Sequence, residues 1–111
     1  MELTAVARLT FVKLKPNVSV EETRKIWDEN IVPAAMAQKG FISCFLLVSE
    51  HVHEGIAVTI WESRDDAGSG ERSGYYLEQV KKFETFMAEP PDRRFYNVNS
   101  NLVFIKEIEA I

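Results

Sequence analysis

The chain opens with a stretch in which apolar and polar side chains roughly alternate. Residues 3–14 read LTAVARLTFVKL, and positions two apart share one face of an extended chain. Lys15, Pro16 and Asn17 then interrupt the alternation with turn-forming residues. The pattern predicts a first β-strand that ends before Pro16.

A helical pattern follows this strand. Ser19 and Glu22 have the spacing of a capping box, in which each side chain bonds the backbone N–H of the other residue. A helix is predicted from there to the residue before Gly40, because glycine commonly ends helices. Pro33 lies inside this range and lacks an N–H, so we expect a kink or a split near Asn30.

Two almost wholly apolar segments follow. Residues 41–49 read FISCFLLVS, and residues 55–61 read GIAVTIW, with a short polar loop between them. A strand that is apolar on both faces is typical of a sheet covered on both sides. The two segments are therefore predicted to form adjacent strands, each covered on both faces.

The next pattern predicts a second helix with an irregular start. Ser63 can cap it, and the acids that follow favour the positive end of a helix dipole. Gly68, Gly70 and Gly74 are expected to interrupt the helix before a stronger segment over residues 72–88. The predicted buried stripe of that segment follows i, i+4, i+7, i+11 spacing: Tyr76, Val80, Phe83 and Met87.

The last element is a predicted strand over residues 95–108, after Pro90 and Pro91 end the helix. The order is then β-α-β-β-α-β in a single domain of 111 residues. Two crossover helices in this order predict an α+β, ferredoxin-like fold: a four-stranded antiparallel sheet with both helices on one face. Because the middle strands are apolar on both faces, we expect the open sheet face to meet a second copy, giving a homodimer.

Charge and composition exclude several classes of function. The net charge of −4 argues against a nucleic-acid partner, which needs a basic surface. No apolar run is long enough to span a membrane, and the N-terminus does not resemble a signal peptide. Cys44 is the single cysteine and is expected to be an inert core thiol. These features predict a soluble, cytoplasmic protein.

Two stretches carry a family resemblance. GFISCFLL after the first helix, and IAVTIWESRDDA leading into the second, resemble the antibiotic biosynthesis monooxygenase-like family of dimeric α/β barrels. The resemblance implies that two sheets meet across a dimer axis. Some members are cofactor-free oxygenases that act on aromatic polyketides or quinols, others degrade haem, and many have no assigned role.

The resemblance supports the fold more than either chemistry. Trp61 matches the functional tryptophan of the polyketide-type oxygenases. Their asparagine four residues earlier and their tyrosine six residues later are replaced here by Ala57 and Ala67. The asparagine, tryptophan and histidine of the haem-degrading members fall at Ala7, Gly70 and Val80.

Trp61 is the first candidate for a ligand contact, because an indole stacks on planar rings and offers one N–H donor. Ala57 and Thr59 share its strand face and are small, which predicts an apolar pocket beside Trp61 under the second helix. Residues 67–74 are expected to form the rim of this pocket. The alternative is that Trp61 serves packing alone.

The second helix supplies the other candidates. Tyr75 and Tyr76 point about 100° apart, so one should face the core and the other the pocket or solvent. Either could handle a substrate proton, and Tyr76 and Phe83 are the predicted ligand contacts of this helix. Trp61, Tyr75 and Tyr76 are therefore the candidate catalytic residues.

Other possible sites are weaker. His51 and His53 could pair on one side of an extended chain and bind a metal if a third ligand joined them. Arg93 and Arg94 are expected on the solvated surface, although either could meet an anion. No nucleotide-binding, zinc-type cysteine or Ser-His-Asp motif is visible in the sequence, so no cofactor is expected.

The sequence thus supports one leading hypothesis and two alternatives. The leading hypothesis is a cofactor-independent monooxygenase that acts on a small planar aromatic or quinol. A non-catalytic homodimer of the same fold that binds a small aromatic ligand is the first alternative. A homodimer whose role is interaction alone is the second.

Overall fold

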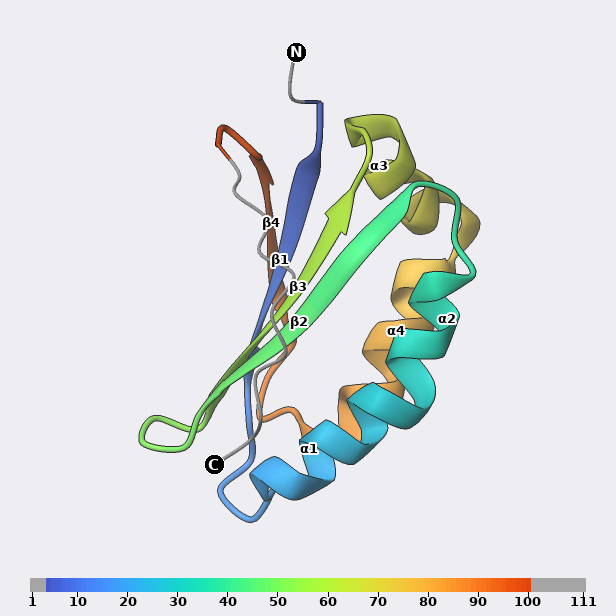
Figure 1. The fold of residues 1–111 in the computed structure, drawn as a ribbon. Helices are drawn as coiled ribbons and strands as arrows, with labels where there is room; N and C mark the ends of the chain where they lie inside the picture. Colours follow the sequence, from blue (N-terminus) through green and yellow to red (C-terminus); the bar gives the residue numbers. More distant parts are fainter. Residues whose placement is uncertain (1–3, 101–111) are drawn as a thin grey trace.

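A computed structural model describes residues 4–100 of the chain (Figure 1). The elements are β1 (Val6–Lys13), α1 (Val20–Ile26), a π-helical turn (Trp27–Ile31), α2 (Val32–Met36), β2 (Phe41–Ser49), β3 (Glu54–Trp61), α3 (Arg64–Ser73), α4 (Tyr75–Phe83), a 3-10 turn (Glu84–Phe86) and β4 (Asp92–Asn97). This order confirms the expected β-α-β-β-α-β arrangement. No helix in the described part of the chain is long and apolar enough to cross a membrane.

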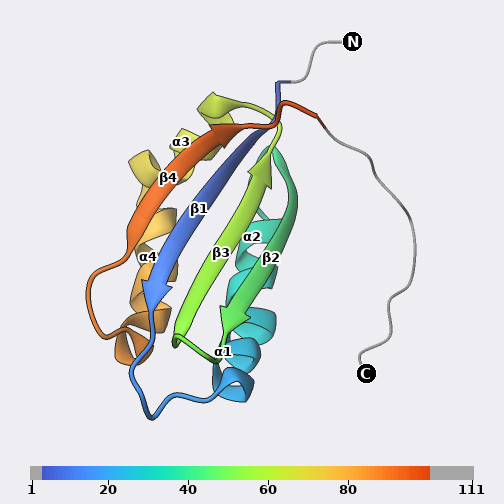
Figure 2. The ribbon, with the colours of Figure 1, turned by 90° about the vertical axis from the view of Figure 1, so that its left-hand side faces the viewer.

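The four strands form one antiparallel sheet in the order β2-β3-β1-β4. All helices lie on one side of it, with α3 at the end of the sheet where β3 finishes (Figure 1). The view turned by 90° shows the other face of the sheet in front of the helices, and no helix or strand among residues 4–100 covers it (Figure 2). The α+β, ferredoxin-like prediction is confirmed.

The first helix begins as expected. The Ser19 hydroxyl accepts from the Glu22 amide at 3.1 Å, and the Glu22 carboxylate accepts from the Ser19 amide at 3.0 Å. The expected irregularity before Pro33 is the π-helical turn, in which the Val32 amide bonds the Trp27 carbonyl five residues back. The helical stretch ends at Met36, earlier than predicted.

Gly40 lies in the turn that leads into β2. Its φ of 81° is left-handed, and a Cβ added there would lie only 2.3 Å from the Asp66 carboxyl carbon. Gly40 is therefore required by the close approach of α3 as well as by the backbone conformation.

The glycine-rich segment corrects the prediction for the second helix. α3 runs through Gly68 and Gly70 without a break, capped by Ser63, whose hydroxyl accepts from the Asp66 amide at 3.1 Å. Only Gly74, with a φ of 87°, interrupts the helix and separates α3 from α4. The second helical stretch ends with the 3-10 turn at Phe86, two residues earlier than expected.

The last strand begins three residues earlier than predicted. Asp92 already pairs with Phe11. The chain returns beside β1 before this point, through a bridge between Leu14 and Met87 and a hydrogen bond from the Lys15 amide to the Phe86 carbonyl. Residues 101–108 of the predicted strand, and residue 3 of the first predicted strand, lie outside the described residues.

Trp61 belongs to the main hydrophobic core. The indole is 1% exposed and lies with Phe41 in an edge-to-face pair whose ring centroids are 5.9 Å apart. The other buried members of this core cluster are Val6, Ala35, Ala67 and Tyr75. The core therefore sits at the end of the sheet where α2 and α3 meet it.

The uncovered sheet face is apolar along its middle rows on β1, β2 and β3, and these rows end at the charged residues Arg94 and Asp92 on the edge strand β4. Strand alternation and register place two rows of apolar side chains there: Leu9, Val58 and Phe45 in one, and Phe11, Ile56 and Leu47 in the other. Phe45 and Leu47 are about half exposed. A sheet face of this composition is typical of a surface that another protein layer covers.

Candidate functional site

A cavity lies between the sheet and the helices. The space open to the centres of water-sized spheres is about 60 Å³, against roughly 10–15 Å³ for a single water. Its lining comes from every layer of the fold: Arg8, Thr10, Val12, Leu14, Thr23, Trp27, Ile31, Leu46, Val48, Gly55, Ala57, Thr59, Tyr75, Tyr76, Gln79, Val80, Phe83 and Met87. The cavity is therefore narrow, mostly apolar, and large enough for several waters or a small ring.

Strand alternation explains which sheet residues reach the cavity. On β1, Arg8, Thr10 and Val12 point toward the helices, and their partners on β3 are Thr59, Ala57 and Gly55. Ala57 has a small side chain and Gly55 has none, so the cavity extends over this part of the sheet.

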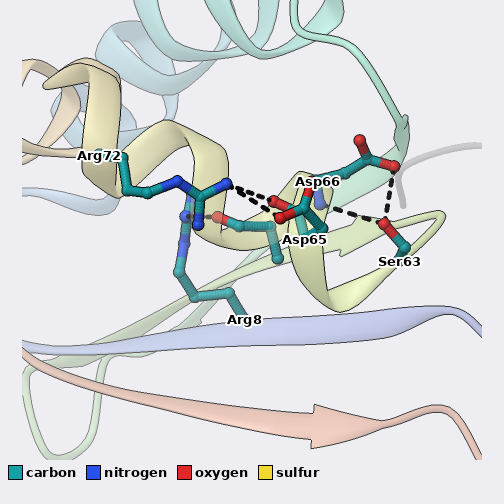
Figure 3. A network of polar contacts seen from close by, with 6 residues as sticks. Arg8, Ser63, Asp65, Asp66 and Arg72 are labelled. Carbon is teal, nitrogen blue, oxygen red and sulfur yellow. Dashed lines mark hydrogen bonds and ion pairs between the residues drawn. The ribbon is translucent and has the colours of Figure 1, made fainter.

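Arg8 is the buried cation of the site. It is only 3% exposed, and burial lowers the pKa of its guanidinium from its usual value. Its Nη1 donates to the Ala67 carbonyl at 3.3 Å (Figure 3), and its Cζ lies 5.5 Å from the Trp61 ring and 4.4 Å from the Tyr76 ring. The Trp61 and Tyr76 rings therefore stabilise this charge by cation–π contacts.

Tyr76 lies between two cations. Besides Arg8, the Arg93 guanidinium approaches its ring to 5.7 Å, and Arg93 is held by an ion pair with Glu71. The Tyr76 hydroxyl shares a hydrogen bond of 3.3 Å with the Thr10 hydroxyl, which also lines the cavity. This phenol is therefore a group at the cavity wall that can give or accept a proton.

Tyr75 also lines the cavity, but it is more deeply buried than Tyr76. Burial raises the pKa of Tyr75 to about 12, although the Arg8 charge opposes this shift. At neutral pH the Tyr75 phenol is consequently fixed in its protonated form and can only donate its proton or accept a hydrogen bond.

The structure places Trp61 behind the cavity wall, not on it. Its indole N–H donates to the Thr59 hydroxyl at 2.9 Å, and Thr59 is the residue that faces the cavity. The expected stacking of Trp61 on a ligand does not fit this position, because Arg8 and Thr59 stand between the indole and the cavity. Trp61 instead orients these two side chains.

The other expected ligand contacts lie together. Ala57 and Thr59 form part of the sheet side of the cavity, while Tyr76 and Phe83 form part of the α4 side. The expected rim at residues 67–74 is not part of the lining. Gly70 instead makes room for packing, since a Cβ there would lie 2.9 Å from a ring carbon of Tyr75.

The two histidines lie in the turn between β2 and β3 and do not line the cavity. Both are exposed, and the His53 carbonyl accepts from the Leu14 amide at 2.8 Å. Within residues 4–100, no group of three His, Cys, Asp or Glu side chains is close enough to share a metal ion. The structure thus does not bring a third ligand to His51 and His53.

Cys44 differs from its prediction as a core thiol. It is only partly buried, because it lies on the edge strand β2 beside a shallow groove against α1. Burial, with a smaller contribution from Asp28, still raises the pKa of the thiol. Cys44 does not line the cavity, although the groove and the cavity share Trp27, Leu46 and Val48 as lining residues.

The sequence interpretation did not single out Arg8 as a site residue. The available signal was an arginine in the middle of a strand, on the same face as Val6 and Val12. A charged residue on a face that helices cover must either find a partner or serve a site. Arg93 and Arg94, which were considered, have carboxylate partners in Glu71 and Asp92.

Comparisons with known proteins were made at the levels of sequence and structure. No family model matches the sequence. No curated protein matches it either. Solved structures do match, over most of both chains in each pair.

SnoaB from Streptomyces nogalater, a cofactor-independent oxygenase, aligns with a TM-score of 0.70 at 11% identity, over 89% of this chain and 97% of its own. A candidate antibiotic biosynthesis monooxygenase from Nitrosomonas europaea gives 0.65 at 15% identity, covering 89% and 94%. Rv0793 from Mycobacterium tuberculosis gives 0.63 at 19% identity, covering 93% and 100%. At such identities the likeness concerns the fold, and the protein has the fold of the antibiotic biosynthesis monooxygenase-like proteins.

Proposed function

We propose that the protein is a cofactor-independent monooxygenase that acts on a small planar aromatic or quinol in the cavity under α4. The observation that carries this proposal is the pairing of two phenols, Tyr75 and Tyr76, with an apolar cavity. Apolar walls favour a planar ring, and phenols at the wall can manage its proton. The named activity of SnoaB, which has the same fold, agrees with this chemistry.

The reaction balances with substrate and dioxygen alone. A ring carbon that becomes a CH2 group in the keto tautomer of the phenol or quinol supplies four electrons and is converted to a carbonyl, while one oxygen atom enters the product and the other leaves as water. The first step is loss of a substrate proton, which makes the ring electron-rich enough to reduce dioxygen. We assign the relay of that proton to Tyr76, and the support is the hydrogen bond of its hydroxyl with Thr10 at the cavity wall.

We also propose that the working unit is a homodimer formed through the uncovered sheet face. The support is the apolar composition of that face, where Phe45, Leu47 and Tyr96 remain about half exposed in the single chain. A second copy presents the same apolar rows, so a two-fold arrangement would cover both faces at once. The cavity lies on the opposite side of the sheet and would stay accessible.

A non-catalytic, small-molecule-binding homodimer is the alternative. It is favoured by the replacement of the oxygenase asparagine and tyrosine positions by Ala57 and Ala67. In this case the cavity would bind the same class of ligand without consuming oxygen.

The deciding experiment measures oxygen consumption and ligand binding in parallel, with a panel of phenols, quinols and anthrones. We expect oxygen uptake with at least one compound, and Tyr76→Phe should lower the rate about 10-fold or more, as expected when a general acid–base group is removed. Tyr96→Phe is the matched control, because Tyr96 lies on the opposite face of the sheet. Binding without oxygen uptake would support the alternative, and equal rates in the two variants would remove Tyr76 from the mechanism.

A further inference from the structure

The strongest unexplained feature of the site is the unpaired charge of Arg8. A guanidinium carries five N–H donors, and the structure pairs one of them, with the Ala67 carbonyl. Within residues 4–100 no carboxylate forms an ion pair with Arg8, although four other arginines have one. Buried arginines are normally paired, because an isolated charge away from water is unfavourable.

The free donors of Arg8 keep contact with open space at a residue that lines the cavity. No fully buried side-chain nitrogen or oxygen in the described part lacks a hydrogen-bond partner, so the remaining guanidinium nitrogens must keep some contact with open space. Arg8 is 3% exposed and lines the cavity, which is the open space beside it. The Trp61 and Tyr76 rings hold the guanidinium in place there.

We propose that Arg8 forms an anion subsite at the sheet side of the cavity, which takes the carboxylate of a small, single-ring aromatic acid. This inference rests on the proposed function for the identity of the ring, and it names the substrate class of the same cavity. A planar guanidinium with several free donors matches the two oxygens of a carboxylate better than a single neutral hydroxyl.

The surroundings of Arg8 fit the remainder of such a ligand. Beyond the guanidinium the cavity is bounded by apolar side chains such as Val12, Val80 and Phe83, which suit a ring. The Tyr76 and Thr10 hydroxyls lie beside Arg8 and can bond the ring substituents or the carboxylate. The small volume of the cavity favours one ring over a fused polycycle.

The test compares an acid with its neutral counterpart. Calorimetric titration with 4-hydroxybenzoate and with methyl 4-hydroxybenzoate isolates the carboxylate charge on the same ring. In the wild-type protein we expect the acid to bind about 10- to 100-fold more tightly, the range of a charge-assisted hydrogen bond. Equal affinities, or tighter binding of the ester, would overturn the proposal without requiring any variant.

The Arg8 variants identify the residue responsible. Arg8→Met should abolish the preference for the acid, and Arg8→Lys should retain part of it because the charge remains. Arg24→Met is the matched control, since Arg24 is an exposed arginine on α1 paired with Glu21, and it should leave the preference unchanged. A preference that survives in Arg8→Met would also overturn the proposal.

Thermal unfolding separates a binding role from a structural one. Without ligand, Arg8→Met should unfold at the same temperature as the wild type or higher, because an apolar side chain replaces an unpaired buried charge. Binding of 4-hydroxybenzoate should raise the unfolding temperature of the wild type and of Arg24→Met, but not that of Arg8→Met. A lower unfolding temperature of the ligand-free variant, with unchanged selectivity, would assign Arg8 to the core instead.

The outcomes also separate this inference from the proposed function. Tight, Arg8-dependent binding of the acid without oxygen uptake from any compound would leave the anion subsite standing and remove the oxygenase activity. Oxygen uptake with neutral quinols, without a preference for acids, would support the oxygenase activity and overturn the anion subsite.

Discussion

The two faces of the sheet differ in polarity, and the difference is the opposite of the usual one. The face that α1, α2 and α4 cover carries Arg8, Thr10 and Thr59 near its middle, whereas the middle rows of the uncovered face are apolar on β1, β2 and β3 and charged only on the edge strand β4, at Arg94 and Asp92. In a simple globular domain the covered face is the apolar one. The difference agrees with the two proposals made above, a ligand in the cavity on the covered side and a second copy of the chain on the uncovered side.

Exposed apolar surface and enclosed polar groups each require a partner, for different physical reasons. Apolar surface that remains open in a single chain calls for another protein layer, since few isolated domains leave a large apolar patch in water. Polar groups enclosed beneath helices call for a partner inside the fold, because burial without hydrogen bonds is costly. The predictions that follow test one face at a time.

The largest effect is expected on the uncovered face. Val58 lies between Leu9 and Phe45 in the middle of the apolar row, so Val58→Asp would place one charge per chain inside the proposed dimer interface. We expect the dimer to dissociate at least about 100-fold more readily, because a buried unpaired carboxylate is strongly unfavourable. Sedimentation or light scattering at micromolar concentration measures the mass.

The matched control for this experiment is Leu77→Asp. Leu77 is an apolar residue on α4 that is 55% exposed, on the opposite side of the sheet from the proposed interface. Its replacement should leave the mass unchanged. A wild-type protein that is already monomeric would contradict the expected role of the uncovered face.

On the covered face, the largest effect should come from the Tyr75 phenol at alkaline pH. Its pKa is raised from 10.0 to about 12 by burial. Between these values the unfolded chain releases the phenol proton while the folded chain keeps it, so the free energy of unfolding falls as pH rises. The contribution is fully present below pH 10 and is lost by about pH 12, with an upper limit of roughly 2–3 kcal/mol.

Urea unfolding between pH 9 and pH 11.5 measures this slope. Tyr75→Phe removes the titrating group, so its stability should fall less steeply than that of the wild type. Identical slopes in the two proteins would mean that Tyr75 is more accessible to water than the structure shows.

A smaller effect is expected where α3 meets α4. Gly70→Ala would bring a Cβ to 2.9 Å from the buried Tyr75 ring, which forms one wall of the cavity, so the free energy of unfolding should fall by about 1–2 kcal/mol. Gly68→Ala is the control, because its Cβ would meet only the flexible end of Arg72 at 3.0 Å. It should raise stability by up to about 1 kcal/mol through helix propensity. Denaturant midpoints compare the two, and a stabilising Gly70→Ala would contradict the packing described.

Local sequence patterns predicted the elements well and their ends less well. The Ser19–Glu22 and Ser63–Asp66 contacts are local, and both helix starts were found where the sequence placed them. The ends of the helices near Met36 and Phe83 depend on how the chain turns into the next strand, which local patterns do not encode. The same reason explains why β4 starts at Asp92.

The site was predicted in part for a similar reason. Alternation along β3 correctly placed Ala57, Thr59 and Trp61 on one face of the strand. It did not predict which of these side chains reaches the cavity and which lies behind its wall. The tertiary arrangement decides this, because Arg8 from a neighbouring strand lies between Trp61 and the open space. Gly70 was expected to leave space for a ligand, whereas the space is filled by Tyr75.

The π-helical turn at Trp27–Ile31 has a consequence for comparing this protein with others. A turn closed by a bond to the fifth residue back holds one more residue than an ordinary helical turn, so it acts as a one-residue insertion absorbed without a loop. An alignment that runs without a gap through this helix would shift every following residue by one position against relatives that lack the turn. Trp27 and Ile31, which both line the cavity, would then be matched to residues that face elsewhere.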